Sequence, residues 1–268
     1  MQLAVTLRRQ VSLSAILAIF LVIIAASPAA AETAAVYTHV YRSDTDCTWS
    51  ESIISNSGAD PLARSYTSAD YVVSVPYPLH CWERINKSAG NIAVAMTLFK
   101  WTGSDWAVCS DSGFYYNTIY SHSWEITLSY LRIMRRCGSG SIGNSTGSYV
   151  YNGEWHGGWN WSGHVSMALA GSEPVTLGEP PTSPAWVNQD GTINLAAVPK
   201  RLPVVGASGR PVRDKLGNMV TIDSREIFKL PASPDQVDIT KQNIGVKQKA
   251  PGEYTKVLQE WELNFPGQ

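Results

Sequence analysis

Short segments that alternate apolar and polar residues, separated by turn residues, constrain the fold of this chain more than any other feature. In the segment Ile92–Phe99, every second residue from Ile92 to Leu98 is a large apolar one. A period of two is typical of a β-strand with one face against a core. Thr102-Gly-Ser-Asp105 separates this segment from Trp106–Cys109, and its Gly and Asp favour a hairpin turn. The pattern predicts antiparallel strands.

The same pattern recurs along the chain. Alternation continues over Trp124–Leu128, and Asn152-Gly153 joins Tyr149–Tyr151 to Glu154–His156. An Asn-Gly pair suits a tight, two-residue type I′ turn. Similar segments bring the total to about seven or eight strands, with no long amphipathic helix; they run over Tyr37–Tyr41 and Tyr71–Val75. This spacing predicts an all-β fold, an antiparallel β-sandwich.

The first 31 residues have the layout of a secretory signal. Arg8 and Arg9 precede the apolar run Leu13–Ala25, and the small residues of Ser27–Ala31 end the segment. The alternative is a membrane anchor, but the run has about 13 residues, whereas a spanning helix needs about 20. We therefore expect cleavage after Ala31 and a secreted, extracellular protein without a membrane span.

Export determines how the four cysteines are interpreted. Cys47, Cys81, Cys109 and Cys137 form an even set, which in an exported protein indicates two disulfide bonds. Of the three possible pairings we favour Cys47 with Cys81 and Cys109 with Cys137, because neighbours in sequence are commonly neighbours in an antiparallel sheet. A zinc site would need Cys-x-x-Cys spacing, which the sequence lacks.

Composition divides the mature chain near residue 172. Residues 32–171 contain all four cysteines, whereas residues 172–268 contain 11 of the 15 prolines. Glu179–Pro184 is typical of a stiff, extended linker. We therefore expect a β-sandwich domain at 32–171, followed at 172–268 by a Pro-rich and largely extended region.

A short internal repeat follows the linker. Val204-Val-Gly-Ala-Ser-Gly209 is followed eight residues later by Val212-Arg-Asp-Lys-Leu-Gly217, and Val220 begins a third step. Gly at the same place in each unit predicts one turn per unit, although two copies are too few for a solenoid. Near the C-terminus the sequence does not decide between a short helix and a short strand. A helix would place on one face Tyr254, Leu258, Trp261 and Phe265, whereas a strand would place on one face Trp261, Leu263 and Phe265.

The charge balance argues against one class of partner. The chain has 21 Lys+Arg and 22 Asp+Glu residues, without the excess of basic residues that is typical of nucleic-acid binders. We expect no nucleic-acid partner, no cofactor and a monomer.

The segment Cys137–Gly147 contains two motifs that resemble functional sites. Gly143-Asn-Ser145-Thr-Gly147 fits the G-x-S-x-G pattern of a hydrolase nucleophile elbow. Gly138-x-Gly140-x-x-Gly143 fits the dinucleotide-binding fingerprint. Both motifs need a strand-to-helix turn in an α/β sheet, whereas this Gly/Ser segment lies between predicted β-strands. We therefore interpret the segment as a loop and expect no catalytic residues in it.

Metal sites have little support from residue spacing. Asp44 and Asp46 could offer carboxylates to calcium, but a turn cap is the simpler interpretation. Glu154, His156 and His164 could hold zinc, but no known ligand motif has their spacing. We expect no metal. The remaining histidines are expected to be surface or packing residues: His39, His80 and His122.

Aromatic residues are densest between Tyr149 and His164, where Trp and Tyr are interleaved with Gly and short polar residues. Sugar rings stack on aromatic planes while polar side chains bind their hydroxyl groups. The candidate ligand-binding residues are therefore Tyr151, Glu154, Trp155, His156, Trp159 and Trp161. The alternative is that these rings fill the core, because Trp159 and Trp161 share one face of a strand.

Two of these segments also carry a family likeness. Asn91–Cys109 and Cys137–Trp161, together with a signal that ends in Ala29-Ala-Ala31, resemble short exported β-proteins of actinobacteria that have no assigned activity. The segment Asp190–Val205 is similar to the tails of secreted proteins of that group. The resemblance implies an exported β-protein, and it assigns no functional residue.

These patterns favour a secreted, non-enzymatic β-sandwich that binds an extracellular polysaccharide or cell-wall glycan. One alternative is a secreted hydrolase with a pair of carboxylates that meet only in the fold, Glu154 among them. Another is a protein-interaction factor, an inhibitor or toxin, that presents the loop Cys137–Gly147. The glycan hypothesis loses its specific support if Trp155, Trp159 and Trp161 are all buried.

Overall fold

The computed structural model describes residues 32–43, 45–56, 62–73, 80–168, 177–206, 209–242, 245–250 and 253–257. Contacts within the chain separate Met1–Ala31 from Glu32–Gln268, so every described residue belongs to the second unit and the predicted signal lies outside them. Within the described ranges, no helix is long and apolar enough to span a bilayer.

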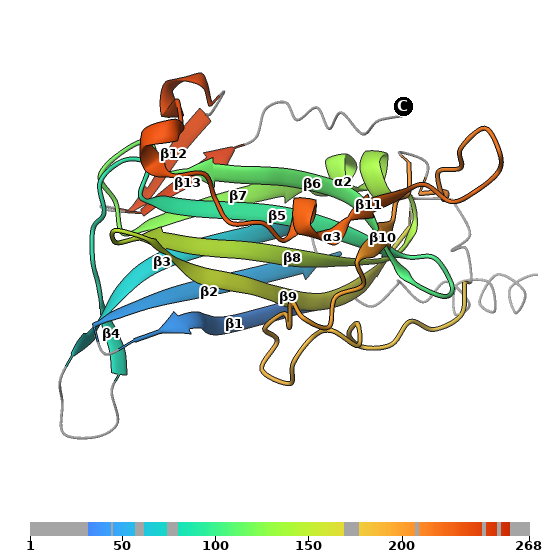
Figure 1. Ribbon diagram of the computed structural model, residues 1–268, viewed down its shortest axis with the longest axis horizontal. Helices are drawn as coiled ribbons and strands as arrows, with labels where there is room; N and C mark the ends of the chain where they lie inside the picture. Colours follow the sequence, from blue (N-terminus) through green and yellow to red (C-terminus); the bar gives the residue numbers. More distant parts are fainter. Residues whose placement is uncertain are drawn as a thin grey trace, which may run out of the picture. The chain divides into compact units, whose positions relative to one another are not determined.

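Two four-stranded antiparallel sheets form the body of this unit. The first sheet has the order β1 (Thr33–Arg42), β2 (Asp46–Ser55), β3 (Leu62–Val73) and β7 (Ser123–Ser129). The second has the order β6 (Trp106–Tyr116), β5 (Ile92–Trp101), β8 (Gly140–Tyr151) and β9 (Trp155–Met167). In Figure 1 the second sheet lies in front of the blue strands β1 to β3, and the two sheets pack as layers. The predicted all-β sandwich is confirmed.

Smaller elements extend this body. Strand β4 (His80–Arg84) pairs with β3, and the hairpin of β12 (Gly245–Ala250) and β13 (Glu253–Val257) continues the first sheet beyond β7. One short helix, α2 (Tyr130–Cys137), connects β7 to β8. Of the C-terminal residues for which helix and strand both stayed open, Tyr254 lies in β13, and those from Leu258 onward lie outside the described residues.

One part of the interior between the sheets is apolar. Ile92, Val94, Met96 and Leu98 of β5 are fully buried there, together with Trp124, Ile126 and Leu128 of β7. These are the residues whose alternation predicts strands, and the opposite residues of β5, such as Phe99, face away from this layer. The sequence periodicity therefore identifies the apolar core correctly.

Another part of the interior is polar. Ser50 Oγ and Ser148 Oγ lie 2.7 Å apart across the two layers, as do Thr146 Oγ1 and Ser65 Oγ. Asn144 of β8 donates its amide N–H groups to backbone carbonyl oxygens of β3 and β2, at 2.9 and 3.1 Å. Because all five side chains are buried, hydrogen bonds hold this part of the sandwich together in place of apolar contacts.

Both disulfide bonds have the sequential pairing. Cys47 of β2 is bonded to Cys81 of β4, with Cα atoms 6.0 Å apart, and Cys109 of β6 is bonded to Cys137 at the end of α2, with Cα atoms 5.1 Å apart. The favoured pairing is confirmed. Each bond fixes a short element, β4 or α2, to one of the main strands.

A C-terminal strap, defined as the described residues from 177 to 242, covers the outer face of the second sheet (orange in Figure 1). It contains β10 (Arg201–Pro203), β11 (Thr221–Asp223) and α3 (Ser224–Ile227), as well as single helical turns at Pro234–Gln236 and Ile239–Lys241. Its apolar side chains are buried against the sheet: Trp186, Ile193, Val198, Leu202, Ile227 and Phe228. The predicted boundary near residue 172 falls between the described segments.

The strap also pairs with both edge strands of the second sheet. At β9, Ile193 N donates to Trp159 O at 2.8 Å and Trp161 N donates to Gly191 O at 2.9 Å. At β6, Val205 N donates to Val108 O at 3.0 Å. Backbone groups that an edge strand would leave unpaired are therefore used to hold the strap.

Three turns of the strap share one hydrogen-bond pattern. Asn188, Gly206 and Asp214 each donate their N–H to the carbonyl oxygen four residues later, and each accepts a bond from the N–H three residues later. That later residue is a glycine with positive φ in every case: Gly191, Gly209 and Gly217. The turn predicted in each repeat unit is confirmed, and the turn at Asn188 is an additional one.

The repeat steps are also joined directly. Val204 N donates to Val220 O, Val212 N to Val204 O, and Val220 N to Val212 O, at 3.1, 3.0 and 2.8 Å. The three valines that begin the eight-residue steps thus close a ring of backbone hydrogen bonds.

Candidate functional site

Trp159 and Trp161, the centre of the predicted ligand-binding segment, lie beneath the strap. Each is 2 % exposed. The ring of Trp161 meets that of Trp186 with 6.0 Å between centroids, and the ring of Trp159 meets that of Phe228 at 5.1 Å. The structure therefore places these two indoles in a second apolar core, between the sheet and the strap, where no ligand reaches them in this conformation.

Glycines of β8 make room for the two indoles. Gly147 is paired with Trp159, and a Cβ atom at Gly147 would lie 2.7 Å from the indole ring. A Cβ atom at Gly143 would overlap the ring of Trp161. Ser145 lies between these glycines and is fully buried.

The predicted loop at Cys137–Gly147 is therefore wrong for residues 140–147, which belong to β8. Glycine is required at positions 143 and 147 because a side chain there would collide with the indole rings of Trp161 and Trp159, and not because the chain turns at these residues. Ser145 is consequently inaccessible as a hydrolase nucleophile, and this segment does not form a loop that a protein partner could bind.

Trp155 lies at the margin of the same aromatic layer and is partly buried. Its Nε1–H donates to Ala232 O of the strap at 3.1 Å, and its ring lies 5.2 Å from that of Tyr151 between centroids. The Tyr116 hydroxyl accepts a bond from Ala232 N at 2.8 Å. Trp155 and Tyr116 together fix this stretch of the strap.

The turn between β8 and β9 has three residues, Asn152 to Glu154. Tyr151 pairs with Trp155, and Asn152 N donates to Glu154 O at 2.9 Å. The predicted two-residue type I′ turn is wrong, because Gly153, with φ of 86°, supplies the positive φ angle within a longer loop. Glu154 consequently belongs to the exposed turn and not to a strand.

His156 links this turn to β1. Its ring stacks on that of Tyr41, with centroids 4.5 Å apart and 21° between the planes. Its Nε2 atom lies 3.2 Å from Glu154 Oε1, and the Glu154 side chain is 83 % exposed. A carboxylate, an imidazole and a phenol ring therefore lie side by side at one end of the sandwich.

Asp46 approaches the same turn from β2. Asn152 Nδ2 donates to Asp46 Oδ2 at 2.8 Å, and the same carboxylate oxygen accepts from Thr45 Oγ1 at 3.1 Å. Asp46 N also donates to Ser43 Oγ at 3.0 Å. Asp46 therefore acts in turn contacts, as the simpler interpretation predicts. Asp44 lies outside the described residues.

We define the turn surface as Tyr41, Asp46, Tyr151, Asn152, Glu154 and His156. Three of the predicted site residues, Tyr151, Glu154 and His156, belong to the turn surface, and Trp155 lies beside it. The strap covers the other two, Trp159 and Trp161. Tyr41, Asp46 and Asn152 complete it. The sequence does not link Tyr41 or Asp46 to this turn, because β1 and β2 approach it only in the fold, and it marks Asn152 only as a turn residue.

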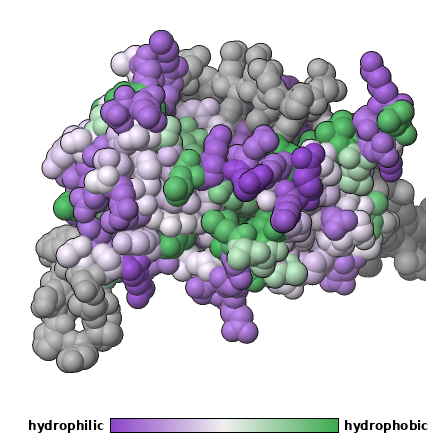
Figure 2. Space-filling model, in the orientation of Figure 1, coloured by the Kyte–Doolittle hydropathy of each residue, from purple (hydrophilic) through white to green (hydrophobic). Residues whose placement is uncertain are grey.

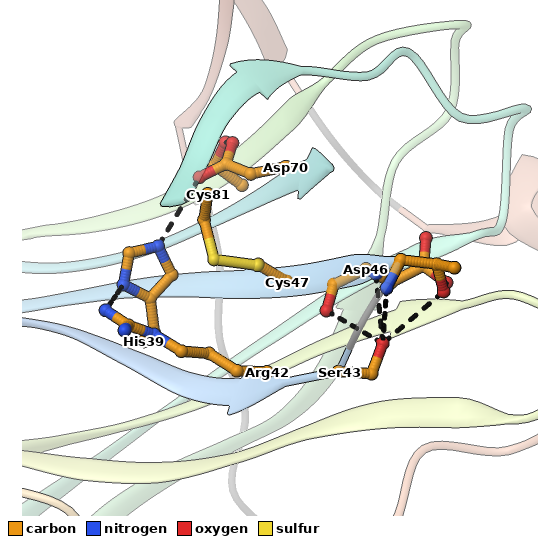
Figure 3. The surroundings of a disulfide bond; sticks show 9 residues. His39, Arg42, Ser43, Asp46, Cys47, Asp70 and Cys81 are labelled. Carbon is orange, nitrogen blue, oxygen red and sulfur yellow. Dashed lines mark hydrogen bonds and ion pairs between the residues drawn. A yellow bond between two sulfur atoms is a disulfide. The ribbon is translucent and has the colours of Figure 1, made fainter. Parts of the chain in front are cut away.

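A second cluster of polar side chains surrounds the Cys47–Cys81 bond (Figure 3). Arg42 Nη2 donates to His39 Nδ1 at 2.8 Å. Because arginine only donates, we assign the ring proton of His39 to Nε2, which lies 3.9 Å from Asp70 Oδ2. The ring of His39 also meets that of Trp49 edge-on, 4.7 Å between centroids. This cluster brings together three strands, β1 to β3, and no sequence motif marks it.

Burial controls the protonation of this cluster. Desolvation, followed by the charge of Arg42, lowers the pKa of His39 to about 4. Desolvation also raises the pKa of Asp70, against the opposing effect of the bond from Ser68. A histidine with such a low pKa is a weak base at neutral pH. The cluster therefore favours packing around the disulfide over proton transfer.

One more carboxyl group, Asp111 of β6, is partly buried near Lys229 of the strap. Thr97 Oγ1 donates to Asp111 Oδ1 at 2.7 Å, and Gly113 N donates to its other oxygen at 3.3 Å. Desolvation raises the pKa of Asp111 to about 6, although these bonds and the charge of Lys229 on the strap oppose the shift.

Among the described residues, no group of three or more His, Cys, Asp or Glu side chains is placed so that it could hold a metal ion. His164 contacts the ring of Trp106 at 5.4 Å between centroids, while His156 contacts Tyr41. Since the two histidines are eight residues apart on β9, about 25 Å separates them along the strand, too far for a shared zinc ion.

Comparison of the chain with known protein families, curated proteins and solved structures identifies no related protein. No protein-family model matches the chain, and no curated protein or solved structure matches it significantly. The likeness to exported actinobacterial β-proteins stays a prediction.

Proposed function

We propose that this protein is an exported, non-enzymatic β-sandwich that binds an extracellular glycan through the turn surface. The observation that carries the proposal is the stack of His156 on Tyr41 beside the exposed carboxylate of Glu154. Aromatic rings next to hydrogen-bonding groups suit the apolar faces and hydroxyls of sugars. Two disulfide bonds suit a protein that functions in an oxidising, extracellular environment.

The position of the turn surface also supports the proposal. Asn152 and Glu154 are exposed, and the rings of Tyr41, Tyr151 and His156 are partly exposed. The backbone of His156 is held from two sides, since His156 pairs with Val150 of β8 and Thr48 Oγ1 of β2 donates to His156 O at 2.8 Å. Because Tyr41 and His156 lie on paired strands, these two residues lose little conformational entropy when the site binds.

Pull-down on insoluble glycans tests the proposal. We expect Glu154→Ala and Tyr151→Ala to reduce retention about tenfold in combination, because each removes a contact group worth about one hydrogen bond or ring contact. Leu195→Ala is the matched control, because Leu195 is 49 % exposed on the strap, outside the turn surface. Equal retention of the double variant and the control would contradict the proposal.

The carboxylate-pair hydrolase is the second candidate, because Asp46 and Glu154 flank Asn152 at the same end. The same assay distinguishes it. Release of reducing sugar by the parent protein, lost in both Asp46→Asn and Glu154→Gln, would favour hydrolysis over binding alone.

A further inference from the structure

A hairpin of the strap projects an apolar side chain into solvent. The hairpin is closed by a bridge between Arg213 and Met219, and Leu216 at its tip is 87 % exposed, the highest value among the large hydrophobic residues exposed in the described part. Met219 is 38 % exposed. In Figure 2 the loop projecting at the upper right carries a hydrophobic area between hydrophilic ones.

Hydrogen bonds hold the tip in this conformation. Asp214 Oδ1 accepts bonds from Leu216 N at 2.8 Å and Asn218 N at 2.9 Å. Arg213 Nη1 donates to Gly217 O at 2.7 Å. At the base of the hairpin, Val212 and Val220 form backbone hydrogen bonds with each other and with Val204. Leu216 is therefore held outward by its own turn, away from the core.

Positive charge surrounds the apolar tip. Arg210, Arg213 and Lys215 are all exposed, and Asp214 is the one acidic residue between Gly209 and Met219. The whole chain has a net charge of −1, so this excess of positive charge is local.

We propose that this hairpin docks on the surface of an anionic phospholipid bilayer, with Leu216 in the interface and Arg210, Arg213 and Lys215 against lipid phosphates. The cations alone would suit any polyanion. The exposed Leu216 favours a lipid surface, because transfer of its side chain from water into the apolar part of a bilayer lowers the free energy, whereas a soluble polyanion offers no such environment. This inference is independent of the glycan site, which lies at the turn between β8 and β9.

Vesicle flotation with the full, disulfide-bonded chain tests the proposal. Vesicles of equal parts phosphatidylglycerol and phosphatidylcholine are compared with pure phosphatidylcholine. We expect binding to the anionic vesicles alone, weakened in high salt because the charges are exposed. Leu216→Ser should lower the partition coefficient about tenfold, and Lys215→Ala about fivefold.

Two control variants match these changes. Leu230→Ser alters a leucine that is 64 % exposed elsewhere on the strap, and Lys241→Ala alters an exposed lysine paired with Asp238. Both should bind as the parent does. Equal binding of Leu216→Ser and the parent would overturn the proposal in favour of a purely electrostatic polyanion site. Absence of binding to anionic vesicles at low salt would overturn it altogether.

Discussion

Gly147 leaves the space that the indole of Trp159 occupies. A methyl group there would lie 2.7 Å from the ring, so either the indole or the strap above it must move. We predict that Gly147→Ala lowers the free energy of unfolding by about 2 kcal/mol, a typical cost of overpacking a core. Urea unfolding followed by tryptophan fluorescence measures this effect.

Gly206→Ala is the control for that change. Like Gly147, it has no positive φ, and its added Cβ would meet Val212 at 3.5 Å, an ordinary contact. We expect it to leave stability nearly unchanged or slightly raised. An equal loss of stability in the two variants would show that contact with the indole of Trp159 is not the reason for glycine at position 147.

Asn144 joins the two sheets through a single side chain. Its Nδ2 donates to Ile53 O and Arg64 O across the sandwich, and the residue is fully buried. We predict that Asn144→Ala costs about 3 kcal/mol, because two buried carbonyl oxygens lose this donor. Asn152→Ala, which removes an exposed contact to Asp46, should cost under about 1 kcal/mol in the same denaturant titration.

At the scale of strands, polarity explains which elements the sequence reveals. Strand β5 is predictable because its inward residues, Val94 among them, are apolar and alternate. Strand β2 is not predicted, because its inward residues Ser50 and Ser52 are polar and make hydrogen bonds to the opposite sheet. The Gly-rich part of β8 resembles a loop for a similar reason. Apolar periodicity cannot detect a strand whose buried face is polar.

The candidate site was predictable only in part. Aromatic density identifies the segment Tyr149–Trp161, but the sequence cannot separate the covered ring of Trp159 from the exposed side chain of Glu154. That difference depends on Phe228 and Trp186, which are distant in sequence and reach the sheet through the strap. Long-range packing of this kind leaves no local signal.

The strap is an integral layer, and Phe228 is its central contact. This ring is 9 % exposed and lies 5.1 Å from Trp159 and 5.8 Å from Trp186 between centroids. We predict that Phe228→Ala lowers stability by about 3 kcal/mol and increases acrylamide quenching of tryptophan fluorescence. Leu230→Ala, at an exposed neighbour, should change neither; unchanged quenching in Phe228→Ala would argue that the strap does not shield the indoles.

At the scale of the whole molecule, two partly buried groups make the free energy of unfolding depend on pH in opposite directions. His39 has its pKa lowered to about 4 from 6.5, so the unfolded chain takes up this proton first, and stability falls as pH decreases from 6.5 towards 4. Asp111 has its pKa raised to about 6 from 3.8, so the folded chain keeps this proton longer, and stability falls as pH increases from 3.8 towards 6. Between about pH 4 and 6 the two effects oppose each other.

Single variants separate these effects. We predict that Asp111→Asn becomes more stable with rising pH across this window, and that His39→Gln becomes less stable, each by about 2 kcal/mol relative to the parent. Urea unfolding at pH 4, 5, 6 and 7 measures both slopes. Parallel pH profiles for the parent and the two variants would contradict the assignment.

The strap covers an aromatic surface that is completed much earlier in the chain. During synthesis from the N-terminus, Trp159 and Trp161 emerge long before Phe228, so a nascent chain displays two large indoles and two open strand edges while its remaining residues are still being made. Such a surface attracts other chains. Slow or interrupted synthesis beyond residue 168 should therefore produce aggregates, although the residues that form the sandwich are already present.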